Sequence, residues 1–160
     1  MMDTASLISE IQSRPAQTIV CDRILVPIDG SPASMHAVEW AIDLARAADA
    51  ELTILMVIDY DAHISAFEQV SMSGYLPSEL KIAAYRFLAE LMHEIPRSVR
   101  AHTRVEEGDP GEVTVAVAAE EESHLIVMGS RGFGTFERIA FGSISTYVTH
   151  HAHSPVLLVK

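Results

Sequence analysis

Residues 125–143 read LIVMGSRGFGTFERIAFGS, a short apolar run followed by a segment that holds four glycines and two serines. The run LIVM is typical of a strand that is buried on both faces of a parallel sheet. The segment behind it is either a phosphate-binding loop or a flexible turn, and glycines at these spacings alone favour the turn. The position of the segment in the fold therefore decides its interpretation.

Strand-like and helix-like stretches alternate along the chain. Ser31 and Asp109 are good helix N-caps, and each precedes a proline, which suits the first position of a helix. Residues 99–105 alternate apolar and polar side chains and predict a half-exposed strand near an edge of the sheet. The expected strands are 24–28, 51–58, 99–105, 124–128 and 156–159, and the expected helices are 32–49, 77–95, 110–122 and about 138–151.

This order predicts a single-domain α/β fold, with a five-stranded parallel sheet, right-handed crossovers and helices on both faces, hence Rossmann-like. The length of 160 residues and the hydrophobic content of 49% suit one domain with a substantial core. Two segments lie outside the alternating pattern. Residues 59–76 are long for a connection and predict a mobile lid, and Leu7, Ile8 and Ile11 predict a short N-terminal helix.

The net charge of −11 argues against nucleic acids and anionic membranes as partners. The longest apolar run, 52–58, is far shorter than the roughly 20 residues that span a bilayer, and we expect a cytoplasmic protein. A single cysteine, Cys21, excludes an internal disulfide. From Gly129 onward, however, the net charge is +2, which favours an anion site over a spacer there.

Three of the expected strands end at residues that suit a ligand site. Ligands of parallel sheets bind outside the carboxyl ends of the strands. Asp29, Val57 and the segment 128–132 lie at these ends, so they could line one pocket. For Asp29 the alternative interpretation is an ordinary turn carboxylate.

The glycines themselves suit an anion. Without a Cβ, Gly129 and Gly132 permit positive φ and let backbone N–H groups approach a bulky anion. Gly142 would begin the last regular helix, where unsatisfied N–H groups and the helix dipole attract phosphate. With Ser143 these residues meet the pattern Gly-x2-Gly-x9-Gly-Ser, and the chain resembles the universal stress protein family.

The resemblance covers residues 22–160 and leaves residues 1–21 as an N-terminal extension. Residues 24–31, ILVPIDGS, are similar to the opening strand and turn of the family. Residues 125–132, LIVMGSRG, are similar to its fourth-strand signature, and residues 154–159, SPVLLV, to its closing strand.

The resemblance implies the fold of the adenine nucleotide alpha hydrolases and ATP binding, because within the family the complete glycine motif marks the ATP-binding branch. ATP, or AMP or ADP, would be bound with Mg²⁺ or Mn²⁺. Asp29 would lie near the ribose or a phosphate-bound metal, and Val57 would contact adenine through its backbone. The nucleotide-site residues implied by position are Pro27, Asp29, Val57, Met128, Gly129, Arg131, Gly132, Gly142, Ser143, Ile144 and Ser145.

The function implied is a nucleotide-dependent switch in the stress response with at most slow ATP hydrolysis. The sequence contains neither a P-loop nor a Gly-x-Ser-x-Gly elbow, and nothing in it indicates a catalytic base. The family's usual dimer implies a homodimer through Pro155–Val159, beside a protein partner that the sequence does not identify. The alternatives are a nucleotide-free interaction module and a weak ATPase or phosphotransferase.

Four further side chains have ordinary structural interpretations. His150, His151 and His153 lie at the end of the last expected helix, where the helix dipole favours histidine without a metal. We expect no structural metal there, since no cysteine or carboxylate lies beside them in the sequence. Trp40, the only tryptophan, is expected in core or interface packing.

Overall fold

The computed structural model describes residues 3–13, 20–60, 76–131 and 142–160. Most of the lid expected at 59–76 therefore lies outside the described residues. The strands are β1 (Arg23–Ile28), β2 (Glu51–Ile58), β3 (Arg100–Glu107), β4 (Leu125–Gly129) and β5 (Val156–Val159). The helices are α1 (Thr4–Ser13), α2 (Pro32–Ala48), α4 (Leu76–Glu94), α5 (Pro110–Glu120) and α6 (Ser143–His151).

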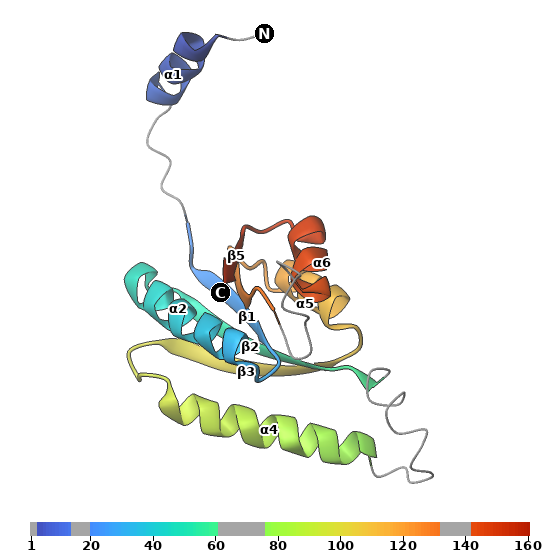
Figure 1. Ribbon diagram of the computed structural model, residues 1–160. Coiled ribbons are helices and arrows are strands. Elements are labelled where there is room, and N and C mark those ends of the chain that lie inside the picture. The colour runs from blue at the N-terminus through green and yellow to red at the C-terminus, as the bar shows by residue number, and fades with distance from the viewer. Residues whose placement is uncertain (1–2, 14–19, 61–75, 132–141) are drawn as a thin grey trace.

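The strands form one parallel sheet of five strands in the order β3-β2-β1-β4-β5, which confirms the predicted fold. Helices α2 and α4 cover one face of this sheet, and α5 and α6 cover the other (Figure 1). The central strand β1 contributes to both cores, because Val26 faces the first and Leu25 the second, each 0% exposed. The polar strand β3 lies at one edge, as predicted, and the apolar strand β5 lies at the other.

Some observed boundaries differ from the predicted ones by one or two residues. The helix expected at 110–122 ends at Glu120, because Glu122 adopts a left-handed φ of 49° that ends the helix. The fourth strand begins at Leu125 instead of His124. The ring nitrogen Nδ1 of His124 instead accepts a hydrogen bond from the backbone N–H of Asp22 at 3.1 Å.

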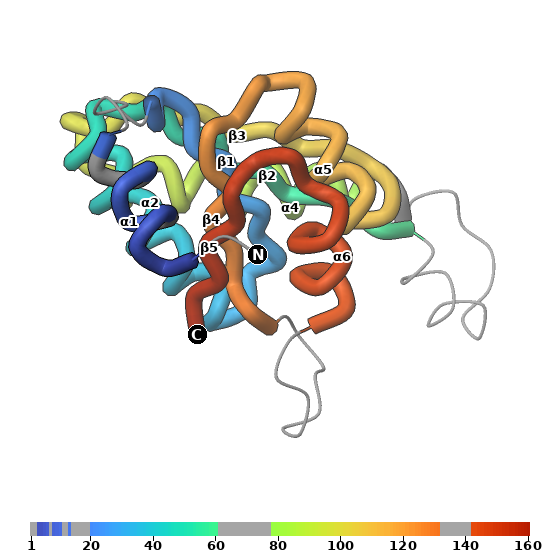
Figure 2. Tube along the Cα trace, turned by 90° about the horizontal axis from the view of Figure 1, so that it is seen from above, coloured from blue at the N-terminus to red at the C-terminus, as the bar shows by residue number. Residues whose placement is uncertain are grey.

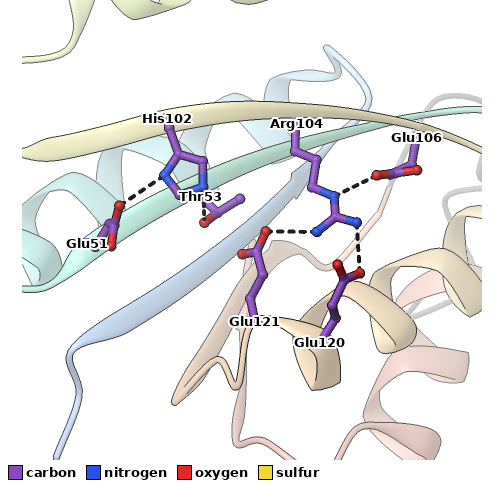
Figure 3. Close-up of polar contacts among 7 residues, drawn as sticks. All are labelled: Glu51, Thr53, His102, Arg104, Glu106, Glu120 and Glu121. Carbon is purple, nitrogen blue, oxygen red and sulfur yellow. Dashed lines mark hydrogen bonds and ion pairs between the residues drawn. The ribbon is translucent and has the colours of Figure 1, made fainter.

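Helix α5 is attached to the edge strand β3 by one arginine (Figure 3). The guanidinium of Arg104 binds three carboxylates, those of Glu106 at 2.6 Å, Glu120 at 2.8 Å and Glu121 at 3.1 Å. These hydrogen bonds, that to Glu120 first, raise the pKa of Arg104. Arg104 thus links the C-terminal end of α5 to β3.

Two expectations concern single features outside the sheet. Helix α1 forms where the sequence predicts a short N-terminal helix. Trp40 on α2 is not in the core, since 49% of it is exposed; its place in an interface stays a prediction. In the described part of the chain, no helix is both long enough and apolar enough to cross a membrane.

Candidate functional site

A cleft of about 620 Å³ opens at the carboxyl ends of β1, β2 and β4. It brings together every residue of the predicted site that the structure describes, from four separate parts of the chain. Gly132 lies outside the described residues. The role of these residues in binding stays a prediction. The predicted residues that line the cleft are Pro27, Asp29, Val57, Met128, Gly129, Arg131, Gly142, Ser143, Ile144 and Ser145.

The turn after β1 is shaped by Asp29, Gly30 and Ser31. Gly30 adopts a φ of 81°, which glycine tolerates without strain. The carboxylate oxygen Oδ1 of Asp29 accepts a hydrogen bond from the backbone N–H of Ser31 at 2.9 Å. Asp29 is therefore a turn-forming residue that also borders the cleft, so the two interpretations of this residue are compatible.

The positive φ predicted at Gly129 is wrong, and the structure shows a packing reason for a glycine at this position. Among the described glycines, positive φ occurs at Gly30 and Gly108 and not at Gly129. A Cβ on Gly129 would instead lie 2.8 Å from the carbonyl carbon of Ala33 and 2.9 Å from the backbone nitrogen of Ser34. The glycine therefore allows the end of β4 to pack against the first turn of α2. This close approach to another element is invisible in the local sequence.

The two ends of the glycine segment lie against each other. The carbonyl oxygen of Ser130 accepts hydrogen bonds from the backbone N–H of Gly142 at 2.9 Å and from Oγ of Ser145 at 3.1 Å. Figure 2 shows the end of β4 and the start of α6 side by side. These bonds place Gly129–Arg131 and Gly142–Ser145 on one wall of the cleft.

Helix α6 begins at Ser143, which agrees with the start expected at Gly142 and is later than the boundary of about 138. Gly142 is the N-cap, with extended angles φ −73° and ψ 161°, and residues 138–141 lie outside the described residues. Because it has no side chain, Gly142 accepts no side-chain hydrogen bond from the N–H groups of the first turn. The N–H groups of Ser143 to Ser145 have no carbonyl partner within the helix and carry the positive end of its dipole. This uncapped start borders the cleft.

The opposite side of the cleft is apolar, and the sequence reasoning missed it. This wall comes from α4, which packs on β2 and β3, whereas the glycine segment lies on the β4 side of the sheet. The helical spacing of these side chains is the same for a core stripe and for a cleft wall, so no local signal separates the two. The α4 residues of the wall are Leu80, Ala83, Ala84 and Phe87.

The described residues hold no group of three or more histidine, cysteine, aspartate or glutamate side chains arranged to bind a metal ion. At the end of α6, the ring of His151 instead stacks on Tyr147 with a centroid distance of 4.0 Å. Its Nδ1 donates a hydrogen bond to the carbonyl oxygen of Tyr147 at 2.8 Å. Among the described residues that line the cleft, Asp29 and Asp59 carry carboxylates.

The sequence and the structure of this chain are similar to those of universal stress proteins. A protein of Methanocaldococcus jannaschii, universal stress protein MJ0531, is 32% identical over 151 residues, which cover 86% of this chain and 81% of that protein. The structure is similar to universal stress protein UspA from Lactobacillus plantarum, with a TM-score of 0.70, 27% identity and coverage of 88% and 98% of the two chains. It is also similar to a universal stress protein solved in complex with cAMP, with a TM-score of 0.63, 25% identity and coverage of 88% and 97%.

The family-level comparison agrees with the glycine spacing and with the strand order. The model of the universal stress protein family matches residues 21–160. The match includes all five strands and every described residue of the cleft. The chain therefore belongs to the universal stress protein family.

Proposed function

We propose that this chain binds an adenine nucleotide in the cleft and works as an ATP-dependent switch in the cytoplasmic stress response, with at most slow hydrolysis. One observation carries the proposal: the cleft joins an apolar wall on α4 to an uncapped helix start at α6. A nucleotide has the matching two-part chemistry, an apolar planar base and an anionic phosphate chain. A relative that is similar over most of its length is described in complex with cAMP, which supports the same ligand class.

The orientation of the nucleotide follows from this division of the cleft. The base would lie on the side of α4 and Val57, where apolar groups dominate, and the backbone of Val57 would contact adenine. The phosphates would lie against Arg131 and the first turn of α6, where backbone N–H groups and a guanidinium attract anions. Because Gly142 has no side chain, a phosphate could approach its backbone closely.

The residues present fit a nucleotide-bound Mg²⁺ or Mn²⁺ better than a metal held by the protein alone. Mg²⁺ usually keeps several waters and binds one or two carboxylates together with phosphates of the substrate. Asp29 and Asp59 both border the cleft and are the side chains that could supply such oxygens. When bound, the ion would neutralise the charge that these carboxylates present to the phosphates.

Calorimetric titration with ATP, with and without Mg²⁺, tests the proposal. In Ile144→Asp, a carboxylate would replace a side chain that is 37% exposed at the start of α6, so we expect ATP affinity to fall at least about tenfold. Ile82→Asp is the matched control, because Ile82 is 57% exposed on α4 and does not line the cleft. Absence of saturable binding by the wild type, or equal affinity of both variants, would contradict nucleotide binding in this cleft.

We also propose that the switch is a homodimer joined through β5, at Pro155–Val159. The carbonyl oxygens of Pro155 and Val159 accept hydrogen bonds from the β4 side at 2.9 and 2.7 Å, so the alternate residues Val156 and Leu158 direct their backbone groups to the open side. An apolar edge of this kind favours pairing with a second copy.

The substitution Leu158→Pro tests the dimer, because it removes a backbone N–H on the open side of β5. Sedimentation analysis should then show a monomer, and the circular dichroism spectrum should be unchanged. A wild-type monomer at all accessible concentrations would rule out the dimer.

A further inference from the structure

Trp40, the only tryptophan of the chain, lies on the side of α2 that faces the edge strand β5. One turn earlier on the helix, Nδ1 of His36 lies 2.9 Å from the backbone oxygen of Lys160, the residue directly after β5. Residues four apart share one side of a helix, so Trp40 faces the same way as His36. Helix α2 also packs against β5, yet 49% of Trp40 is exposed. A large aromatic side chain is therefore open to solvent beside the edge of the sheet.

Apolar side chains on both sides of Trp40 extend this surface. Leu44, a further turn along α2, and Leu157 of β5 are both partly buried against the core cluster on the α2 face of the sheet. Trp40 lies about 6 Å beyond His36 along α2, a distance that about two residues of a strand span. Since α2 runs back against the strands, Trp40 is level with the middle of β5. Trp40, Leu44 and Leu157 are called the Trp40 strip below.

The open edge of β5 determines how a second copy of the chain could pair with it. Val156 and Leu158 direct their backbone groups to the open side. In an antiparallel pair of two such strands, both residues form hydrogen bonds when Val156 lies opposite Leu158 of the second copy. This register places Leu157 on the twofold axis. The axis is perpendicular to the sheet, so both copies of α2 lie on the same face and turn their Trp40 sides towards each other.

We propose that the Trp40 strip is the second contact surface of the β5 homodimer and that it binds the same strip of a second copy. The inference rests on the homodimer proposed above. A stable interface buries roughly 800 Å² of each partner, more than the edge of a four-residue strand offers. A buried tryptophan contributes about 150–250 Å², and aromatic side chains are enriched at the cores of interfaces. A dimer built on β5 therefore needs surface beside the strand, and Trp40 provides the largest apolar side chain there.

The fluorescence of the single tryptophan tests this contact directly. Sedimentation equilibrium of the wild type first gives the concentrations at which monomer and dimer prevail, and acrylamide quenching is then measured at both. The quenching constant should fall at least about twofold in the dimer, and the emission should shift to shorter wavelength, because the half-exposed indole becomes covered. Leu158→Pro should keep the quenching constant of the monomer at every concentration.

Substitution of Trp40 measures how much the contact contributes to dimerisation. In Trp40→Ala the dissociation constant of the dimer should rise at least about tenfold, as for a central interface residue. Trp40→Phe keeps an aromatic ring and should weaken the dimer less. Tyr85→Ala is the matched control, because Tyr85 is 57% exposed on α4, which packs on β2 and β3 instead of β5. The control should dimerise like the wild type, and circular dichroism of each variant checks that it is folded.

The possible results separate this inference from the dimer itself. If the wild type dimerises but Trp40 is quenched equally in monomer and dimer, the Trp40 strip is not a contact surface, and pairing through β5 stands. The same conclusion follows if Trp40→Ala dimerises like Tyr85→Ala. A wild type that stays a monomer at all accessible concentrations overturns both the β5 dimer and this inference. None of these results depends on whether the cleft binds a nucleotide.

Discussion

Helices α2 and α6 begin beside the same cleft, and their first turns differ at one decisive residue. In both, a serine at the third helical position donates its hydroxyl to the carbonyl of the N-cap residue: Ser34 to Ser31 at 2.9 Å and Ser145 to Gly142 at 3.0 Å. In α2, Oγ of Ser31 in turn accepts the backbone N–H of Ser34 at 3.3 Å. In α6 the N-cap is a glycine, which has no side chain to accept a hydrogen bond.

The difference shows which helix start is complete by itself. Helix α5 repeats the arrangement of α2, because Oδ1 of Asp109 accepts the backbone N–H of Glu112 at 2.9 Å. Replacing a capping side chain by alanine costs about 1 kcal/mol of stability, whereas replacing it by glycine costs only a few tenths of a kcal/mol. Gly142 therefore costs the fold little and leaves the start of α6 open to a ligand of the cleft.

The largest effect is expected where the two helix starts meet the end of β4. Gly129→Val would place a branched side chain where even a Cβ lies 2.8 Å from the backbone of Ala33, so the start of α2 would have to move. We expect the free energy of unfolding to fall by about 3 kcal/mol, measured by urea denaturation. In the control Gly142→Ala, the nearest described atoms outside the chain neighbours would lie 3.7 Å from the added Cβ, and the loss should stay below about 1 kcal/mol. Equal losses would show that Gly129 is not a packing glycine.

The second prediction concerns a substitution that gives α6 the side-chain cap that α2 has. Gly142→Asp would give α6 a side-chain cap and raise the free energy of unfolding by a few tenths of a kcal/mol, since the backbone at Gly142 is already extended. The same carboxylate would repel the phosphates, so ATP affinity should fall at least about tenfold. Calorimetry in EDTA measures this affinity without a metal ion that could bridge the two anions.

Gly142→Asn is the control for the charge. It also caps the helix, so its stability should match that of the aspartate variant, while its loss of ATP affinity should be smaller. If both variants bind ATP like the wild type, the start of α6 does not contact the nucleotide. If only the asparagine variant binds normally, charge and not occupation of the N–H groups accounts for the loss.

The α2 and α6 comparison also shows what could be predicted from the sequence. Ser31 and Asp109 each precede a proline. The starts of α2 and α5 therefore depend on neighbouring residues in the sequence, and both were predicted correctly. The packing role of Gly129 and the cleft wall on α4 depend on elements distant in the sequence, so local patterns could not reveal them. The succession of strands and helices along the chain was predictable, because four of the strands are short apolar runs and β3 alternates apolar and polar side chains.

A third prediction concerns the side-chain cap of α2. Ser31→Ala removes the acceptor for the backbone N–H of Ser34, in a residue that is 3% exposed. We expect a loss of about 1 kcal/mol in the free energy of unfolding, measured by urea denaturation. Asp109→Ala in α5 should cost a similar amount, since it removes the same kind of bond. A much larger loss in Ser31→Ala alone would mean that the serine also supports the turn at Asp29.

The smallest effect is expected when α2 is given the N-cap that α6 has. Ser31→Gly should destabilise the protein by only a few tenths of a kcal/mol, less than Ser31→Ala, because glycine leaves the first N–H groups open to water. The thermal unfolding midpoints of the two variants, compared in one buffer, measure the difference. If Ser31→Gly were as costly as Ser31→Ala, a glycine N-cap would be expensive in this fold.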